Sequence, residues 1–193
     1  MIGGAQNRIT AKQLREEELA AAENPGYGNS LLKIDEKGGI ILSNKLHSNR
    51  DLKLEEVIKK AIFAKEPVFD EHLAKHYNKD LIDKGYYGVV LHGQPQSVLL
   101  FDYILESKNV NILANIIKNR SDYSGEPIFL VACNTGKETS DKDCFAQVLA
   151  NALNVDVKAP TTCLTLTDYE IYFSDENCHR VSGEYIVFHP RYK

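Results

Sequence analysis

The chain has 193 residues, of which 43% are hydrophobic and 26% are charged, and these values exclude a fibrous or wholly disordered protein. Its length predicts one packed domain with an N-terminal extension. The formal net charge of −4 comes without a cluster of Lys and Arg, which argues against nucleic acid as a partner because phosphate binding needs concentrated positive charge.

Residues 1–84 predict a helical extension packed on the core that follows. A capping box at Thr10 starts a helix over residues 11–23. The segment "LLKIDEKGGIILSN" predicts a hairpin, and "LKLEEVIKKAIFAK" predicts an amphipathic helix. A further helix is expected over much of Asp70–Asp83.

Residues 85–193 predict an α/β core. The runs "YYGVVLH", "EPIFLVAC" and "VDVKAP" are typical of buried strands, and "SVLLF" predicts a short additional one. Amphipathic helices in "NVNILANIIKNR" and "DCFAQVLANALN" separate the buried strands. This alternation predicts a three-layer sandwich with a mostly parallel central sheet, and the tail from Cys163 onward alternates like antiparallel strands.

Neither a membrane span nor an export signal is expected. No stretch reaches the roughly 20 apolar residues of a span, and the first residues lack the hydrophobic core of a Sec signal, so synthesis in the cytoplasm without such a signal is expected. The four cysteines lack C-x-x-C spacing, which predicts reduced thiols and no metal site; they are Cys133, Cys144, Cys163 and Cys178.

Two of the predicted strands end on a reactive side chain beside a small residue. His92 precedes Gly93, and Cys133 follows Ala132. Ligands bind at the carboxyl ends of parallel strands, where both residues are expected. If the two strands are adjacent and joined through the helix near residues 109–119, the imidazole and the thiol should lie within roughly 3–6 Å of each other.

Such a pair can perform nucleophilic catalysis. A free thiol is mostly protonated at neutral pH, and an adjacent imidazole can remove its proton. We therefore predict that His92 is the general base and Cys133 the nucleophile. The backbone N–H groups of Gly93 and Cys133 are candidates for an oxyanion hole, and Gly93 leaves room for a substrate carbonyl. No metal or organic cofactor is required.

Other interpretations stay open at these positions. A cysteine ending a buried strand is often a core thiol, and a histidine there is often structural. Asp102 can orient the imidazole of His92, line a specificity pocket or lie in an exposed loop. Asn134 and Thr135 can shape the oxyanion site or cap the next turn.

The pairs His92-Gly93 and Ala132-Cys133, each after an apolar strand, resemble caspase-like (clan CD) cysteine peptidases, which include caspases, gingipains, clostripain and the autoprocessing domains of large bacterial toxins. The resemblance implies a caspase-like fold and a cysteine endopeptidase with His92 and Cys133 in the catalytic roles. Because "VACNTG" differs from the Q-A-C-x-G signature of caspases, a preference for cleavage after Asp is not implied.

A second resemblance covers residues 86–190. The segments "HGQP", "YSGEPIFLVACNTG", "FAQVLANALNVDVKAPT" and "GEYIVFHP" resemble the C-terminal toxin modules of Rhs-type and other polymorphic bacterial toxins. This resemblance implies a module that a specialised secretion system delivers into target cells, with a protein or peptide substrate and a cognate immunity protein. Two alternatives are another thiol acyl-transfer toxin, such as a deamidase or transglutaminase-like enzyme, and a non-catalytic binding module.

Overall fold

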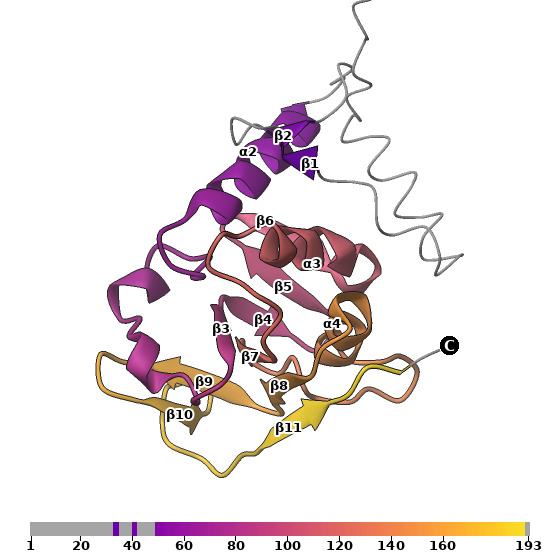
Figure 1. The fold of residues 1–193 in the computed structure, drawn as a ribbon. Helices are drawn as coiled ribbons and strands as arrows, with labels where there is room; N and C mark the ends of the chain where they lie inside the picture. The colour runs from indigo at the N-terminus through magenta and orange to yellow at the C-terminus, as the bar shows by residue number, and fades with distance from the viewer. Residues whose placement is uncertain (1–32, 35–39, 42–48, 192–193) are drawn as a thin grey trace, which may run out of the picture. The chain divides into compact units, whose positions relative to one another are not determined.

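The computed structural model describes residues 33–34, 40–41 and 49–191, which are coloured in Figure 1. The chain divides into two compact units, Met1–Lys60 and Ala61–Lys193. Residues 61–84, which we expected in the N-terminal extension, therefore belong to the same unit as the α/β core. The helix predicted over residues 11–23 lies outside the described residues.

The first unit contains the predicted hairpin and most of the predicted helix. Strands β1 (Lys33–Ile34) and β2 (Ile40–Ile41) pair antiparallel. Helix α2 (Asn49–Phe63) begins in this unit and ends in the second. Its apolar side chains recur at helical spacing and are buried: Leu54, Val57, Ile58, Ala61 and Ile62.

A mixed four-stranded sheet forms the centre of the second unit, in the order β11-β8-β7-β3. Strands β3 (Tyr87–Val90), β7 (Ile128–Val131) and β8 (Val157–Pro160) are parallel, and β11 (Tyr185–Phe188) pairs antiparallel with β8. The prediction of a mostly parallel sheet with an antiparallel C-terminal strand is confirmed. All four residues of β7 are buried, so both faces of the sheet are covered.

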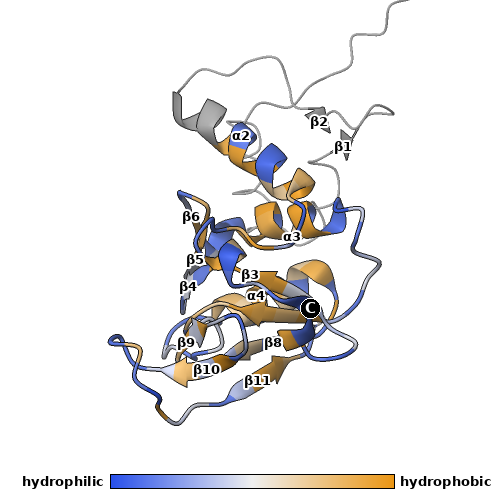
Figure 2. Ribbon diagram, turned by 90° about the vertical axis from the view of Figure 1, so that its left-hand side faces the viewer, coloured by the Kyte–Doolittle hydropathy of each residue, from blue (hydrophilic) through white to orange (hydrophobic). Residues whose placement is uncertain are grey.

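Helices cover one region of this core and pack against each other. They are α3 (Val110–Lys118), preceded by a 3-10 turn (η3, Ser107–Asn109), and α4 (Phe145–Leu153), which also contacts β8 and β11. Both helices follow the predicted ranges closely because each carries a continuous apolar stripe that is buried. In Figure 2 the core strands and helices are mostly orange and the connecting segments are mostly blue.

A hairpin, one of two short 3-10 helices and the residue after the other contribute to a hydrophobic cluster on the sheet. The hairpin consists of β9 (Cys163–Leu166) and β10 (Ile171–Ser174), and the 3-10 helices are η1 (Leu73–Lys75) and η2 (Lys79–Leu81). The sheet contributes Val90, Phe129 and Val131 to this cluster, and Leu164 and Ile82 are among the side chains packed against it.

The prediction of a helix over much of Asp70–Asp83 is wrong, because this range contains two short 3-10 helices. Asn78 has an extended backbone, with φ −131° and ψ 121°, and its side chain accepts a hydrogen bond from the Asp80 N–H. This local bond competes with the helical bond pattern, so two 3-10 turns form in place of a continuous α-helix.

A three-stranded antiparallel meander follows β3. Its strands are β4 (His92–Gln94), β5 (Ser97–Leu100) and β6 (Tyr103–Glu106), in the order β4-β5-β6. The sequence predicted only the middle strand. His92 therefore begins β4, two residues after the last residue of β3.

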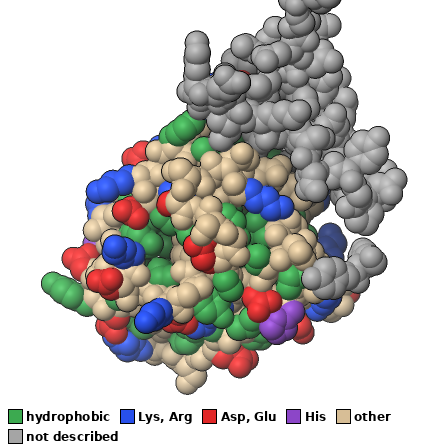
Figure 3. All heavy atoms as spheres, viewed as in Figure 1, with side chains coloured by type: hydrophobic (Ala, Val, Ile, Leu, Met, Phe, Trp, Pro, Cys, Tyr) green, Lys and Arg blue, Asp and Glu red, His purple; other side chains and the backbone are tan. Residues whose placement is uncertain are grey.

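Charged side chains of both signs are interspersed on the face of the molecule shown in Figure 3. Within the described residues, no helix is both long enough and apolar enough to cross a membrane.

Candidate functional site

Two adjacent parallel strands bring His92 and Cys133 to the same edge of the central sheet. Val90 of β3 lies opposite Val131 of β7, and the pairing continues because the Leu91 N–H donates to the Val131 carbonyl at 3.3 Å. His92 and Cys133 each follow their strand by two residues. The strands are neighbours with α3 between them in sequence, as expected.

His92 faces a carboxylate that sequence reasoning missed. Its Nε2 atom lies 3.6 Å from Oδ2 of Asp70. The imidazole is half-exposed at 52%, whereas the side chain of Asp70 is only 16% exposed. The histidine therefore presents part of its ring to solvent while a largely buried anion lies beside it.

Asp70 follows a third parallel segment at the same edge. Val68 forms a parallel bridge with Val90, and the Phe69 N–H donates to the Val90 carbonyl at 2.8 Å. Oδ1 of Asp70 accepts hydrogen bonds from the N–H groups of His72 at 2.8 Å and Leu73 at 2.9 Å. These bonds fix the carboxylate and leave Oδ2 directed at His92. The only sequence signal was the short apolar pair before Asp70 in "PVFD".

The Cys133 thiol contacts the backbone of β9. Its Sγ atom accepts a hydrogen bond from the Leu164 N–H at 3.2 Å and lies 3.6 Å from the Leu164 carbonyl oxygen. Burial raises the pKa of Cys133; the Leu164 N–H opposes this rise, and the neighbouring Cys163 adds to it. Among residues 49–191, the thiol contacts the Leu164 backbone and makes no hydrogen bond to His92, so β9 holds it in place. The raised pKa favours the protonated thiol at neutral pH.

Gly93 packs directly on the turn that carries Cys133. An ideal Cβ at this position would lie 2.8 Å from the Cys133 carbonyl oxygen and 2.6 Å from Cγ2 of Thr135. In the β4–β5 hairpin, Gln94 pairs with Ser97 across a two-residue turn, so these two residues form a hydrogen-bonded pair. The next pair, Gly93 and Val98, is then not hydrogen-bonded, and the N–H of Gly93 points away from β5. The absence of a Cβ thus permits close contact with the Cys133 turn, in addition to any role toward a substrate.

We predict that Gly93→Ala destabilises the fold by about 1–3 kcal/mol, because the added methyl meets backbone and must displace β4 from the Cys133 turn. Gly88→Ala is the comparison variant: the three nearest atoms to a Cβ there belong to the side chain of Ile82, which can move more easily than backbone, so its cost should be smaller. Chemical denaturation of both variants measures the difference. Equal free energies of unfolding for Gly93→Ala and the wild type would contradict this packing.

Asn134 and Thr135 close the turn after Cys133. The Thr135 hydroxyl is fully buried and donates to the Ala132 carbonyl at 2.7 Å. Asn134 has a φ of 59°, and its side-chain amide donates to Sγ of Cys163 at 3.4 Å. These contacts support the turn-capping interpretation of both residues.

Asp102 lies in the two-residue turn between β5 and β6, and it is exposed. Asp70 contributes a carboxylate beside the imidazole of His92, at 3.6 Å. The preceding residue, Phe101, donates its N–H to the Phe69 carbonyl at 2.7 Å, so this turn packs beside the Asp70 segment.

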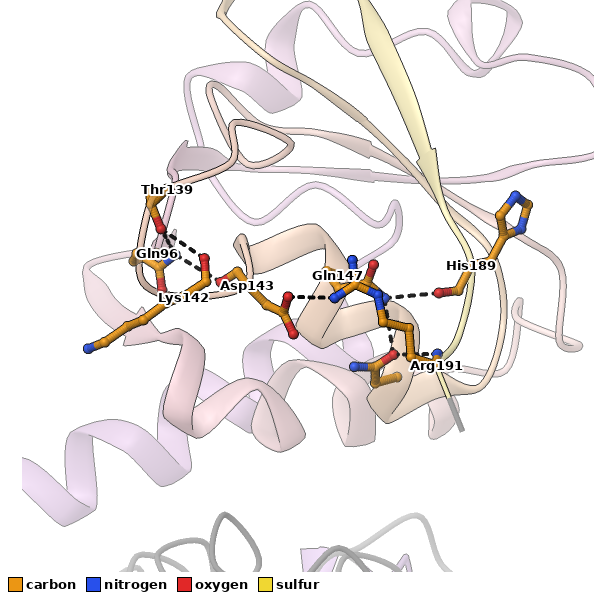
Figure 4. Close-up of polar contacts among 8 residues, drawn as sticks. Gln96, Thr139, Lys142, Asp143, Gln147, His189 and Arg191 are labelled. Atoms are coloured by element: carbon orange, nitrogen blue, oxygen red, sulfur yellow. Dashed lines mark hydrogen bonds and ion pairs between the residues drawn. The ribbon is translucent and has the colours of Figure 1, made fainter. Parts of the chain in front are cut away.

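The tip of the β4–β5 hairpin is fastened to the loop that follows Cys133 (Figure 4). The Gln96 side-chain amide donates to Oγ1 of Thr139 at 3.2 Å and to the Asp143 carbonyl at 2.9 Å. Arg191 pairs with the Asp143 carboxylate at 2.7 Å, near a polar cavity of about 450 Å³ whose lining includes neither His92 nor Cys133. These bonds link the β4–β5 hairpin, which begins at His92, to the loop that follows Cys133.

His92–Asp70 is not the only histidine–aspartate pair in the described residues. The three others join exposed side chains: His76–Asp168, His179–Asp175 and His189–Asp156. What distinguishes His92 is its position just after the carboxyl end of β3, beside the Cys133 turn. No group of three or more His, Cys, Asp or Glu side chains arranged to hold a metal ion occurs in the described part of the chain.

The raised pKa of Cys133 makes a prediction about thiol reactivity. With a small neutral alkylating reagent at pH 7, exposed Cys178 should react faster than Cys133, because a higher pKa leaves a smaller fraction of thiolate. The ordinary pKa of a thiol is 9.0, and that of Cys133 is raised above it. The alkylation rate of Cys133 should therefore continue to increase with pH above pH 9.0. Peptide mapping of timed samples measures both rates; faster alkylation of Cys133 at pH 7 would contradict a protonated resting thiol.

Comparison with known proteins gives one match. A family model described as "Domain of unknown function (DUF8616)" matches residues 58–178, which is more than half of the chain and includes Asp70, His92 and Cys133. No curated protein and no solved structure matches the chain.

Proposed function

This chain belongs to the DUF8616 family, and we propose that it is a caspase-like cysteine peptidase with Cys133 as nucleophile and His92 as general base. The observation that carries the proposal is the convergence of three chain segments. Asp70, His92 and Cys133 follow neighbouring parallel segments and occupy one edge of the sheet in that spatial order. This edge is where α/β proteins bind their ligands.

The proposed reaction begins with proton transfer. Because burial raises the pKa of Cys133, His92 must remove the thiol proton as the sulfur attacks the substrate carbonyl. The N–H groups of Gly93 and Cys133 stabilise the oxyanion, and His92 returns the proton to the leaving amine. Water activated by His92 then hydrolyses the thioester and regenerates the thiol. No metal or organic cofactor takes part.

Asp70 acts as a positioning residue in this proposal. Its carboxylate is held by two backbone N–H groups and faces Nε2 of His92, so it can fix the ring orientation and stabilise the imidazolium that forms when Cys133 is deprotonated. The other ring nitrogen, Nδ1, is then the one that accepts the proton of Cys133.

Asp70→Asn should lower kcat/KM by roughly 10²-fold or more, because the amide keeps an oxygen for the two N–H groups but loses the negative charge beside His92. The loss should shrink at high pH, where the thiol needs less help to ionise, and a purely structural role would not produce this pH profile. Asp168→Asn removes the charge beside exposed His76 and serves as the control. Unchanged kinetics for Asp70→Asn would remove Asp70 from the mechanism.

We propose further that the peptidase is a toxin module of a polymorphic bacterial toxin. The resemblance of residues 86–190 to such modules supports this proposal. The module would be made in the bacterial cytoplasm, delivered into target cells by a specialised secretion system and neutralised in the producer by a cognate immunity protein. Its substrate would be a protein or peptide of the target cell.

Product analysis tests the reaction type. Expression of the chain in bacteria without an immunity protein should generate new protein N-termini, detected by labelling free α-amines before digestion. The same extracts from cells expressing Cys133→Ala are the control. Modified glutamine side chains without new N-termini would identify a deamidase or a transglutaminase-like enzyme, which uses the same pair of residues.

The hydrogen bond from Leu164 to the resting thiol favours one competing function, a non-catalytic binding module in which Cys133 only fastens the hairpin β9–β10 to the sheet. In that case an electrophilic peptide should not modify Cys133 faster than a small alkylating reagent does. A peptidase should show a marked preference for the peptide.

A further inference from the structure

We propose that Cys133 and Cys163 form a reversible disulfide that blocks the nucleophile. The fold alone places the two thiols where they can form this disulfide. That the disulfide would inhibit the protein rests on the proposed function of Cys133 as a nucleophile. Cys163 is the first residue of β9, and Cys133 lies in the turn after β7, so the two cysteines come from segments far apart in sequence.

Each thiol contacts the residue that follows the other cysteine. Sγ of Cys133 accepts the Leu164 N–H at 3.2 Å, and Sγ of Cys163 accepts the Asn134 side-chain amide at 3.4 Å. Standard bond lengths from the Leu164 nitrogen back to Cys163 place Sγ of Cys133 within about 6 Å of the Cys163 Cα. A distance of this size is compatible with a Cα···Cα separation of about 4.4–6.8 Å, the range in which two cysteines can be bridged with little movement of the backbone.

The environment of the two cysteines permits both formation and reduction of the disulfide. Both thiols are partly exposed, whereas Cys144 is buried in the core. Among the strands that the structure describes, β9 pairs with β10 alone, so a small shift of this hairpin does not disrupt the central sheet. The Asn134 N–H also donates to the Thr162 carbonyl at 3.0 Å, which fixes the two chain segments side by side. Electrostatic interaction with Cys163 contributes to the raised pKa of Cys133, as expected for neighbouring thiols.

The oxidant would be a low-molecular-weight disulfide such as oxidised glutathione. One protein thiolate attacks the reagent, its S–S bond breaks and one glutathione thiol leaves; the second protein thiolate then attacks the mixed disulfide and releases the other glutathione. Two protein thiols are thereby oxidised by two electrons, the reagent is reduced to two thiols, and the two thiol protons pass to the departing thiolates. Excess reductant reverses both steps.

The test is peptide mapping of the folded chain after incubation with oxidised glutathione. Trypsin places Cys133 in residues 121–137, but residues 159–180 contain both Cys163 and Cys178. The Cys178→Ser background, which changes an exposed thiol, therefore makes the assignment unique. We expect peptides 121–137 and 159–180 to be joined, Cys144 to stay free, and dithiothreitol to separate the pair. Glutathione adducts without the joined peptide, or two free thiols, would overturn the proposal.

Peptidase assays on the same samples separate this proposal from the proposed function. Oxidation should abolish cleavage in the Cys178→Ser chain and dithiothreitol should restore it, and adding Cys163→Ser should prevent formation of the joined peptide. A joined peptide in a chain that cleaves nothing when reduced would refute the peptidase and leave the disulfide intact. Cleavage that depends on Cys133 but continues without a joined peptide at any glutathione ratio would refute the disulfide alone.

Discussion

Cys133→Ala should abolish toxicity in bacteria that lack an immunity protein and lower peptide cleavage by at least about 10³-fold, while the protein stays folded. The thiol is only partly buried at the edge of the sheet, so its removal leaves little cavity. His92→Ala should reproduce the loss of activity, and the double variant should be no worse than either single variant, because members of a catalytic pair act as a unit. Growth assays, cleavage rates and melting curves provide the readouts.

Two other cysteines are matched controls. Cys144→Ala removes a buried thiol and should cost on the order of 1 kcal/mol of stability, with activity falling only in proportion to the folded fraction. Cys178→Ala removes an exposed thiol and should change neither property. If well-folded Cys133→Ala protein still killed cells, the assignment of the nucleophile would be wrong.

The largest expected effect on stability is at Arg120. Its side chain is buried, donates to the Ala61 carbonyl at 2.7 Å and to the Tyr87 hydroxyl at 2.6 Å, and forms a two-bond pair with Asp122 at 2.9 and 3.0 Å. Burial works against ionisation of Asp122, but hydrogen bonds from Arg120 and Tyr87 lower its pKa below the usual value. Removing the guanidinium would leave a carboxylate, a hydroxyl and a carbonyl without this partner.

Arg120→Ala should therefore destabilise the protein by about 2–4 kcal/mol, mainly through the lost hydrogen bonds of the buried guanidinium, because the Asp122 side chain left behind is 41% exposed. Arg120→Lys keeps the charge but not the planar fork, so its cost should be intermediate. Lys108→Ala breaks an exposed ion pair with Glu106 and should cost less than about 1 kcal/mol. Denaturant titration measures the free energies of unfolding, and an Arg120→Ala value within 1 kcal/mol of wild type would contradict the network's role.

Periodic apolar patterns predicted the regular elements of the core well. α3 and α4 each bury a continuous helical stripe, and the buried runs became β3, β7 and β8. The segment around Asp70–Asp83 failed because local side-chain bonds, such as that of Asn78, decide its conformation and leave no periodic signature.

Only part of the candidate site was predictable from the sequence. His92 and Cys133 stood out because each ends an apolar run beside a small residue. Asp70 follows only two apolar residues, and its proximity to His92 depends on one parallel bridge between Val68 and Val90 that no local pattern indicates. The contact of Cys133 with Leu164 likewise depends on how a distant hairpin docks, which is a tertiary effect.

Intact-mass analysis with an electrophilic peptide tests the central claim most directly. A peptide with a thiol-reactive group at its carboxyl end, based on a cleavage site found in intoxicated cells, should add one peptide mass to the wild-type chain at Cys133. His92→Ala should slow this reaction by orders of magnitude at neutral pH, whereas alkylation of exposed Cys178 by a small reagent should be unaffected. Equal peptide labelling of Cys133 in wild type and His92→Ala, or labelling of Cys178 in preference to Cys133, would contradict the account.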